Sequence, residues 1–293
     1  MATTIALADN NQLLPLHLLC KDSYSISPNL SIPLWRVKEP KRIPIDMPLA
    51  KSDLWAHVWG VSLLLAQLAC SVFQEEVVDA TVLDIGTGMG VSSIALAISG
   101  AALVLLRNFA PDLCYWTNEC WYPFALPLSL LLLCSNLLCV LELNGFNDSR
   151  LRFDHLNWHE PLDSSLVAKF HLVVGADVIY MRNALSSIAR IVDDAMLSGG
   201  ITVLVDAGRP NVEEFQDACF DRGLVATHYD IFRYQTSVCV LRKASIVVVT
   251  KGEPSLRSQA IHQRIAEFCK STAGLPLETK EVFVSEFGCC QKT

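Results

Sequence analysis

The sequence predicts an α/β protein in which helices cover both faces of a largely parallel sheet. Apolar segments of strand length alternate with segments of helical length over most of the chain. Buried strands separated by helices imply right-handed crossovers between parallel strands. The length of 293 residues fits one large domain with extensions, and the hydrophobic share of 52% is enough for a substantial core.

Most strand candidates are separated by helical patterns, as parallel strands require. The last two strand candidates are joined without a clear helix, which predicts an antiparallel pair at one edge of the sheet. The strand candidates are Thr81–Ile85, Leu103–Leu106, His171–Gly175, Ile201–Val205, Leu224–Asp230 and Ser245–Val249. The helical candidates between them are 91–99, 125–143, 183–197 and 211–222.

Segments at both ends of the chain are predicted to flank the sheet domain. Residues 1–50 are interpreted as an N-terminal arm, in which the alternation and the prolines of "LSIPLWRVKEPKRIPI" indicate an edge hairpin. A helix is expected over about 54–73. Residues 253–293 are predicted to be a helical extension, because "SLRSQAIHQRIAEFCKS" is amphipathic. The sheet domain itself is expected to span 51–252.

Glycines are concentrated directly after the first strand candidate, in "VLDIGTGMGVSSIALAISGA" (82–101). Gly86, Gly88 and Gly90 open a helical segment, and their missing side chains let backbone N–H groups approach a ligand closely. In an open parallel sheet, ligands bind beyond the carboxyl ends of the strands. The sequence therefore predicts a ligand loop; close packing of helix on strand is the structural alternative.

The spacing of these glycines disfavours a dinucleotide. The dinucleotide fingerprint needs glycine or alanine at position 91, where this chain has Val91, and its third glycine comes one residue early. Asp84, on the strand before the loop, is a poor neighbour for a pyrophosphate but a good one for a sulfonium or ammonium group. These features favour S-adenosylmethionine over NAD. A nicotinamide-dependent oxidoreductase remains a rival interpretation.

The composition restricts the partners and the compartment. A net charge of -7 argues against nucleic acid as the main partner, since phosphates select basic surfaces. The 11 cysteines include no CxxC pair and no zinc-type spacing, so no metal is predicted. An odd number of cysteines fits a reducing compartment. We therefore expect a cytoplasmic location, with the nucleus as the alternative.

One apolar segment, residues 125–143, approaches the length of a membrane span. Pro127, Asn136 and Glu142 interrupt it, and unpaired polar groups are costly in lipid. A buried helix of a large α/β domain explains the segment better, so no membrane partner is predicted.

Several segments together resemble one family of methyltransferases. "VLDIGTGMG" resembles the first motif of the seven-β-strand, class I S-adenosylmethionine-dependent methyltransferases. "LWAHVWGVSLLLAQLA", "LRFDHLNWHEPL", "LELNG" and "FHLVVGADVIY" are similar to elements of family 16, which contains many protein-lysine methyltransferases. The resemblance covers about residues 50–230. It implies a Rossmann-like three-layer sandwich with a mostly parallel seven-stranded sheet and an antiparallel edge pair.

The resemblance also implies a set of site residues and a reaction. The reaction is N-methylation of a lysine on a protein substrate, with S-adenosylmethionine as cofactor. Asp177 and Tyr180, from the D-x-x-Y signature, are expected to orient the incoming amine. The cofactor-binding residues implied are Trp59, Asp84, Gly86, Thr87, Gly88, Gly90, Trp158 and Ala176, with Trp158 beside the adenine.

Structural alternatives stand beside these assignments. Trp59 and Trp158 also fit ordinary core tryptophans, and Asp177 also fits a strand-end cap. Asp206 and Arg209, in "VDAGRP", are interpreted as a loop salt bridge rather than as a substrate contact. Methylation of a small-molecule amine and a non-catalytic methyltransferase-like binding protein remain alternative functions.

The family pattern breaks after the second strand candidate. Family members end that strand with an acidic residue that holds the ribose hydroxyls, whereas this chain continues Leu106-Arg107-Asn108. The next carboxylates, Asp112 and Glu119, lie within a segment that resembles an insertion over residues 107–124. Either the insertion returns a carboxylate to the ribose, or it removes the contact.

Overall fold

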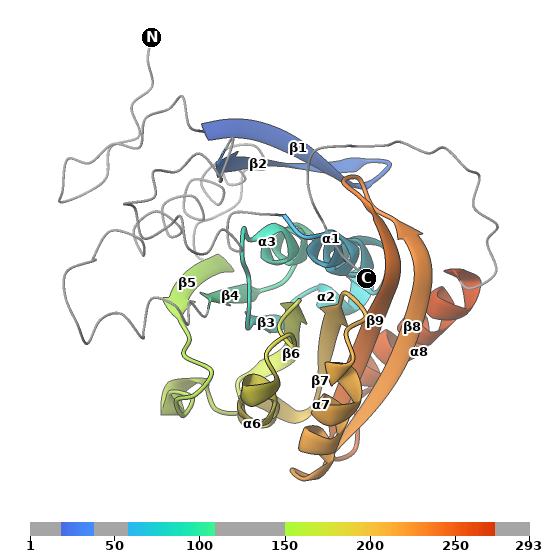
Figure 1. Ribbon diagram of the computed structural model, residues 1–293. Helices are drawn as coiled ribbons and strands as arrows, with labels where there is room; N and C mark the ends of the chain where they lie inside the picture. Colours follow the sequence, from blue (N-terminus) through green and yellow to red (C-terminus); the bar gives the residue numbers. More distant parts are fainter. Residues whose placement is uncertain (1–18, 38–57, 109–149, 273–293) are drawn as a thin grey trace, which may run out of the picture.

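The computed structural model describes residues 19–37, 58–108 and 150–272 (Figure 1). A seven-stranded sheet has helices on both faces, and a two-stranded hairpin lies beside it. The predicted Rossmann-like three-layer fold is confirmed. The strands are β1 (Leu19–Ser27), β2 (Leu30–Val37), β3 (Thr81–Asp84), β4 (Leu103–Asn108), β5 (Leu151–His155), β6 (Phe170–Ala176), β7 (Met196–Asp206), β8 (Leu224–Gln235) and β9 (Val240–Lys251).

The strand order reverses at the centre of the sheet. The order is β5-β4-β3-β6-β7-β9-β8, so the chain moves outward from β3 to β5 and then returns to the other side of β3. Strands β3 to β7 pair in parallel, and β9 is antiparallel to both β7 and β8, as predicted for the edge pair. Because ligands of such sheets bind where the order reverses, the expected site lies beyond the carboxyl ends of β3 and β6.

Strand β5 was absent from the strand candidates. Its sequence, LRFDH, places charged residues between the apolar ones, and β5 lies at the end of the sheet with β4 as its neighbour. An edge strand does not need the continuous apolar run of a central parallel strand. The sequence of β5 therefore lacks the apolar run that identifies the central strands.

Alternate residues of the strands pack into two separate cores. Val82, Val104 and Val174 belong to the core beneath α1, α3 and α8. Leu83 and Val173 point to the opposite face and pack with α6 and α7. Figure 1 shows these helix groups on opposite sides of the sheet. Helix α8 contributes buried residues to the first core, so the predicted C-terminal helix packs on the same domain.

The described helices agree with the predicted positions, except at the start of the first. That helix begins at Gly60 with Trp59 as its N-cap, later than predicted, and it continues as a π-helical turn to Val72, close to the predicted end at about 73. The helices are α1 (Gly60–Gln67), η5 (Leu68–Val72), α2 (Gln74–Val77), α3 (Val91–Ile98), η7 (Ser164–Leu166), η8 (Arg182–Ala184), α6 (Leu185–Ala195), α7 (Asn211–Phe220) and α8 (Leu256–Thr272).

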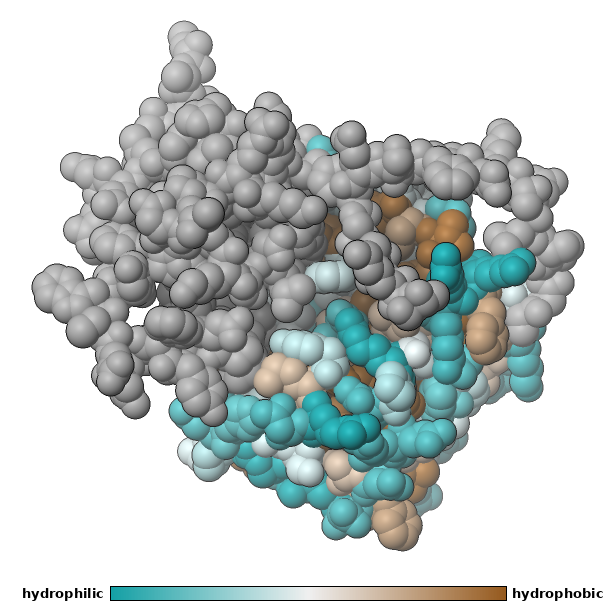
Figure 2. All heavy atoms as spheres, viewed as in Figure 1, coloured by the Kyte–Doolittle hydropathy of each residue, from teal (hydrophilic) through white to brown (hydrophobic). Residues whose placement is uncertain are grey.

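The apolar segment 125–143 lies outside the described residues. Among the helices that the structure describes, none has the length and apolar character needed to cross a membrane. Hydrophilic residues predominate on the part of the described surface seen in Figure 2. Most apolar residues of the parallel strands are enclosed in the two cores, whereas Val225, Phe232 and Val240 of the antiparallel edge pair are exposed.

The N-terminal hairpin begins earlier than predicted. Strand β1 pairs antiparallel with β2 from Leu19↔Val37 to Ser27↔Leu30, so only its second strand falls in the predicted hairpin segment. Ile32 and Leu34 are fully buried in the core that includes α1 and α3. Polar residues in β1 (LCKDSYSIS) conceal its strand character in the sequence.

Candidate functional site

A buried carboxylate holds the glycine loop between β3 and α3. Asp84 is fully buried, and its Oδ2 accepts hydrogen bonds from the hydroxyls of Ser92 (2.9 Å) and Ser93 (2.7 Å). The backbone N–H of Gly86 donates to Oδ1 at 3.2 Å. Burial raises the pKa of Asp84, and these hydrogen bonds oppose the shift. Asp84 therefore connects the end of β3, the loop and the first turn of α3.

The three glycines serve different purposes. A Cβ on Gly86 would lie 2.3 Å from Cγ1 of Val178, so Gly86 allows close packing against the segment after β6. Gly90 caps α3 with a left-handed backbone, at φ 82°. Gly88 also has a positive φ, 51°, but in the part of the chain that the structure describes a Cβ there would meet no atom within 4 Å. The loop is therefore packed at Gly86 and open at Gly88.

Trp158 lies against this loop. Its side chain is 2% exposed, and its indole N–H donates to the carbonyl of Ile85 at 2.9 Å. A Cβ on Gly86 would be 3.8 Å from the indole ring, and the ring meets Tyr180 edge to face at 6.3 Å between centroids. Trp158 thus joins the glycine loop to the D-x-x-Y segment.

The other predicted cofactor residues are placed less directly. Trp59 is half-buried at the N-terminus of α1, where its carbonyl accepts a hydrogen bond of 2.7 Å from the Ser62 hydroxyl. Thr87 is 3% exposed, and its hydroxyl pairs with that of Ser93 at 3.1 Å. Ala176 ends β6, whose neighbour in the sheet is β3. Thr87 and Ala176 therefore lie at the predicted edge of the sheet.

Ion pairs hold the segment after β6. Asp177 has a positive φ of 60°, and its two carboxylate oxygens pair with the two terminal nitrogens of Arg209. Arg209 also donates to the fully buried carboxylate of Asp206, at 2.9 Å from NH1 and 2.8 Å from its backbone N–H. The structure therefore has the predicted loop salt bridge, and it adds Asp177 to it.

The electrostatics of this cluster follow from its burial. Burial raises the pKa of Asp206, and the contacts with Arg209 oppose the rise. Burial disfavours the charged form of Arg209, but Asp177 and Asp206 outweigh it and hold the pKa of the guanidinium above its usual value. Two carboxylates and one guanidinium leave a formal charge of −1. Asp177 is consequently oriented as half of an ion pair.

The backbone of the D-x-x-Y segment is fixed by a residue that the sequence analysis did not select. The side-chain amide of Asn211 donates to the carbonyls of Ile179 and Tyr180, at 3.1 Å each. The Arg209 guanidinium lies 5.9 Å from the centre of the Tyr180 ring. Asn211 begins α7 directly after Pro210, where an asparagine reads as an ordinary helix start. Nothing in the sequence distinguished it.

Strand β4, the second strand candidate of the sequence, ends without a carboxylate, as the sequence indicated. Strand β4 extends to Asn108, and Leu106 pairs with Asp84 in register. Asp112 and Glu119 lie outside the described residues, as does most of the predicted insertion. Among the described residues, no group of three His, Cys, Asp or Glu side chains is arranged to hold a metal ion.

Solved structures of methyltransferases share this architecture. A 16S rRNA methyltransferase from T. thermophilus has a TM-score of 0.50 and 17% identity over 83% of this chain and 53% of that one, so the chain spans about half its length. A precorrin-6y methyltransferase from Geobacter metallireducens has a TM-score of 0.44 and 16% identity over 64% of this chain and 88% of that one. The chain has the Rossmann-like fold of class I methyltransferases.

Part of the chain also matches the model of one methyltransferase family. The model described as lysine methyltransferase matches residues 133–215, which include Trp158, Asp177 and Tyr180. The resemblance predicted from the sequence is confirmed over this part of the chain. The comparison with curated proteins found no match.

Proposed function

We propose that this protein is an S-adenosylmethionine-dependent N-methyltransferase that acts on a lysine of a protein substrate. The observation that carries the proposal is the open position at Gly88. A loop held by several hydrogen bonds presents a glycine whose missing side chain has no described atom within 4 Å, at the carboxyl end of a central parallel strand. The D-x-x-Y segment lies beside this loop, through Val178 and Trp158.

The described residues fit the cofactor on one side of the site. When bound, S-adenosylmethionine supplies a methyl group on a positively charged sulfur. The buried carboxyl group of Asp84 accepts hydrogen bonds from the loop and from the first turn of α3. Among the described residues, the backbone at Gly88 leaves room for a ligand. The ribose side has no carboxylate at the end of β4. We expect the site to lack one or two charge-assisted hydrogen bonds to the ribose. Each would weaken cofactor binding by about 1.5–3 kcal/mol.

The residues of the D-x-x-Y segment would act on the acceptor amine. Methyl transfer needs a neutral amine, and an apolar aromatic wall favours deprotonation by excluding water. Tyr180 would supply such a wall, and the buried Trp158 supports its ring edge to face. Asp177 is held by Arg209 and therefore orients the acceptor through the fixed segment instead of serving as a free base.

The protein-lysine substrate rests on two supports. The matching family is described as lysine methyltransferase, and a net charge of -7 suits a basic substrate segment. A small-molecule amine and an RNA base are different acceptors that the same fold accommodates. Both are outcomes of the labelling experiment below.

The cofactor is tested by calorimetric titration of the full chain with S-adenosylhomocysteine and with NAD. We expect binding of S-adenosylhomocysteine only, and about 100-fold weaker binding in Gly88→Val, whose side chain would enter the ligand space. Gly223→Val is the matched control. Gly223 also has a positive φ, 73°, and no described residue has an atom within 4 Å of its Cβ position, but it lies in the turn before β8. Binding of NAD alone, or of neither ligand, would refute the proposed cofactor.

The acceptor is tested by incubating the protein with methyl-labelled S-adenosylmethionine and a cell lysate. We expect label that protease releases and ribonuclease does not, and methylated lysine after acid hydrolysis of the labelled protein. Asp177→Ala should abolish most of this label while still binding S-adenosylhomocysteine. Label confined to RNA or to small molecules would overturn the lysine assignment and leave the cofactor assignment intact.

A further inference from the structure

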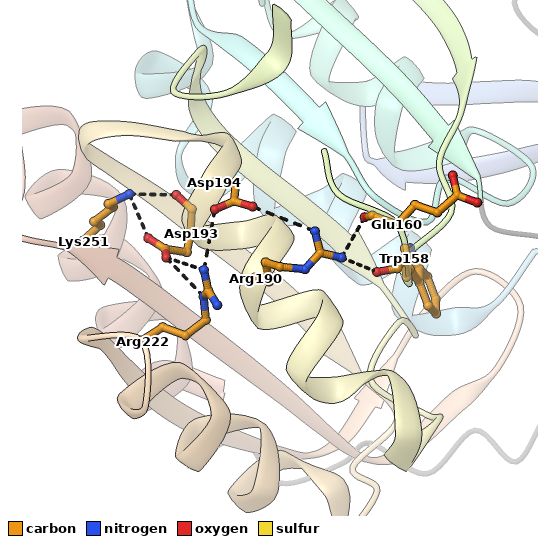
Figure 3. Close-up of polar contacts among 7 residues, drawn as sticks. All are labelled: Trp158, Glu160, Arg190, Asp193, Asp194, Arg222 and Lys251. Carbon is orange, nitrogen blue, oxygen red and sulfur yellow. Dashed lines mark hydrogen bonds and ion pairs between the residues drawn. The ribbon is translucent and has the colours of Figure 1, made fainter. Parts of the chain in front are cut away.

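Helix α6 contacts the turn that presents Trp158 to the glycine loop. The guanidinium of Arg190 donates from NH2 to the carbonyl of Trp158 at 3.0 Å and to the carbonyl of Glu160 at 2.7 Å. Figure 3 shows Arg190 extending from α6 to both carbonyls. Its ion pair with Asp194 is longer, 4.0 Å. The shortest contacts of Arg190 are therefore with backbone oxygens of the turn.

The turn is short and closed by its own residues. The side-chain oxygen of Asn157 accepts from the N–H of His159 at 3.0 Å, and the N–H of Glu160 donates to the Asn157 carbonyl at 3.2 Å. The Asn157 amide donates to the Glu160 carboxylate at 2.8 Å. These bonds set the shape of the turn. The internal bonds do not attach the turn to the rest of the fold. The contacts from Arg190 attach it to α6.

The turn is bonded through Trp158 to the residue that precedes the glycine loop. The Trp158 indole donates to the carbonyl of Ile85, the residue between β3 and Gly86. Ile85 in turn donates its N–H to the carbonyl of Val174 on β6, at 3.0 Å. A displaced Trp158 would thus leave the Ile85 carbonyl unpaired and open a space beside Gly86.

We propose that Arg190 is a positioning residue for the ligand site: through the Trp158 turn, it holds the glycine loop in the geometry that binds the cofactor. The inference rests on the proposed function. Among the described residues, Arg190 bonds to the turn and to Asp194 rather than to the glycine loop. Its two hydrogen bonds preorganise the loop, so that less ordering is needed when a ligand binds.

A neighbouring arginine provides the control. Arg222 donates to the carboxylate of Asp193, at 2.9 and 3.1 Å, and lies 3.6 Å from Asp194. It is partly exposed, as Arg190 is, and contacts the C-terminal end of the same helix. Figure 3 shows Arg222 beside Lys251, on the side of Asp193 and Asp194 away from Trp158. Replacing Arg222 removes side-chain contacts at the same end of α6, shorter than the Arg190–Asp194 pair, without touching the turn.

The experiment compares S-adenosylhomocysteine affinity with thermal stability in Arg190→Met, Arg190→Lys and Arg222→Met. We expect Arg190→Met to weaken binding about tenfold and Arg190→Lys to give an intermediate value, because one ammonium replaces the fork of donors. Arg222→Met should lower the melting temperature while leaving the affinity unchanged. Equal weakening in the two methionine variants, or none in Arg190→Met, would overturn the inference. If Arg190→Met does not fold, the lysine variant decides the question.

A double-mutant cycle tests the route through Trp158. If Arg190 acts through the indole, Arg190→Met should cost less affinity in a Trp158→Phe background than in the wild type. Additive losses would overturn this route. The wild-type titration separates the two levels of the argument: no binding of S-adenosylhomocysteine to the wild type refutes the proposed function, whereas wild-type binding that is insensitive to Arg190 refutes only this inference.

Discussion

The loop after β3 and the segment after β6 lie at the same edge of the sheet, yet different chemistry holds each in place. Asp84 is fully buried and accepts hydrogen bonds from neutral groups, the hydroxyls of Ser92 and Ser93 and the N–H of Gly86. Asp177 instead pairs with a guanidinium that is 31% exposed. The donors to Asp84 are therefore uncharged groups in a buried environment. The donor to Asp177 is a charged group in partial contact with solvent.

The difference has a physical consequence for each region. A buried carboxylate that satisfies several donors is costly to remove, because every donor then lacks a partner in a dry environment. A partly exposed ion pair contributes less to stability and can rearrange, because water screens its charges. We therefore expect the glycine loop to depend on Asp84 for its fold and the D-x-x-Y segment to depend on Arg209 for its function.

The largest expected effect is that of Asp84→Ala. The substitution leaves donors of the loop unpaired, so the free energy of unfolding should fall by about 3 kcal/mol. Urea denaturation measures it. Asp230→Ala is the control, since Asp230 also has several partners, Lys243, Ser245 and His228, but is 28% exposed. A loss in the control as large as that in Asp84→Ala would break the contrast between dry and solvated carboxylates.

Arg209→Met should have a smaller effect on stability and a larger one on activity. It leaves Asp177 and the buried Asp206 without their cation, which we expect to cost about 2 kcal/mol after allowing for the exposure of the pair. Methyl transfer to the labelled acceptor should fall at least tenfold, about 1.4 kcal/mol in the barrier.

Arg222→Met serves as the matched control for this second prediction, because Arg222 is 32% exposed and also pairs with two carboxylates. It should retain methyl transfer. If Arg209→Met also retained methyl transfer, the segment after β6 would not depend on its ion pair for function. The two regions would then differ in stability only.

The strands that a pattern could identify are those with continuous apolar runs. Central strands such as β3, β6 and β7 are buried on both faces, so their sequences differ plainly from the helices between them. Strands β1 and β5 have neighbours on only one side among the described residues, and polar residues interrupt their sequences. Edge strands therefore escape such a search more easily, although the edge strand β8 was predicted over Leu224–Asp230.

The residues of the candidate site likewise fall into those that a sequence motif identifies and those that it does not. The glycines and the D-x-x-Y segment stand in motifs, so the sequence gives their positions and their proximity follows from the parallel sheet. Arg190 and Asn211 hold these motifs by contacts with backbone carbonyls. Such contacts join residues about thirty positions apart and leave no pattern in a single sequence. The pairing of Asp177 with Arg209 was equally hidden, although each residue was selected.

The smallest effect is the pH dependence of stability, and its sign separates the two kinds of carboxylate. Burial raises the pKa of Asp84 above its unfolded value near 3.9. Its stabilisation of the fold, relative to Asp84→Asn, is therefore complete below that value and is lost as the pH rises through the folded pKa. For Asp230, hydrogen bonds from Lys243, Ser245 and His228 outweigh burial and lower the pKa.

The contribution of Asp230 consequently has the opposite sign. Relative to Asp230→Asn, the wild type should be stabilised above about pH 3.9 and lose this advantage as the pH falls through the lowered pKa. Urea denaturation of the wild type and both asparagine variants, repeated between about pH 3 and pH 7, gives two difference curves that should slope in opposite directions. Parallel curves would mean that Asp84 is hydrated in the folded protein, and the loop would then be held by the same solvated chemistry as the outer strands.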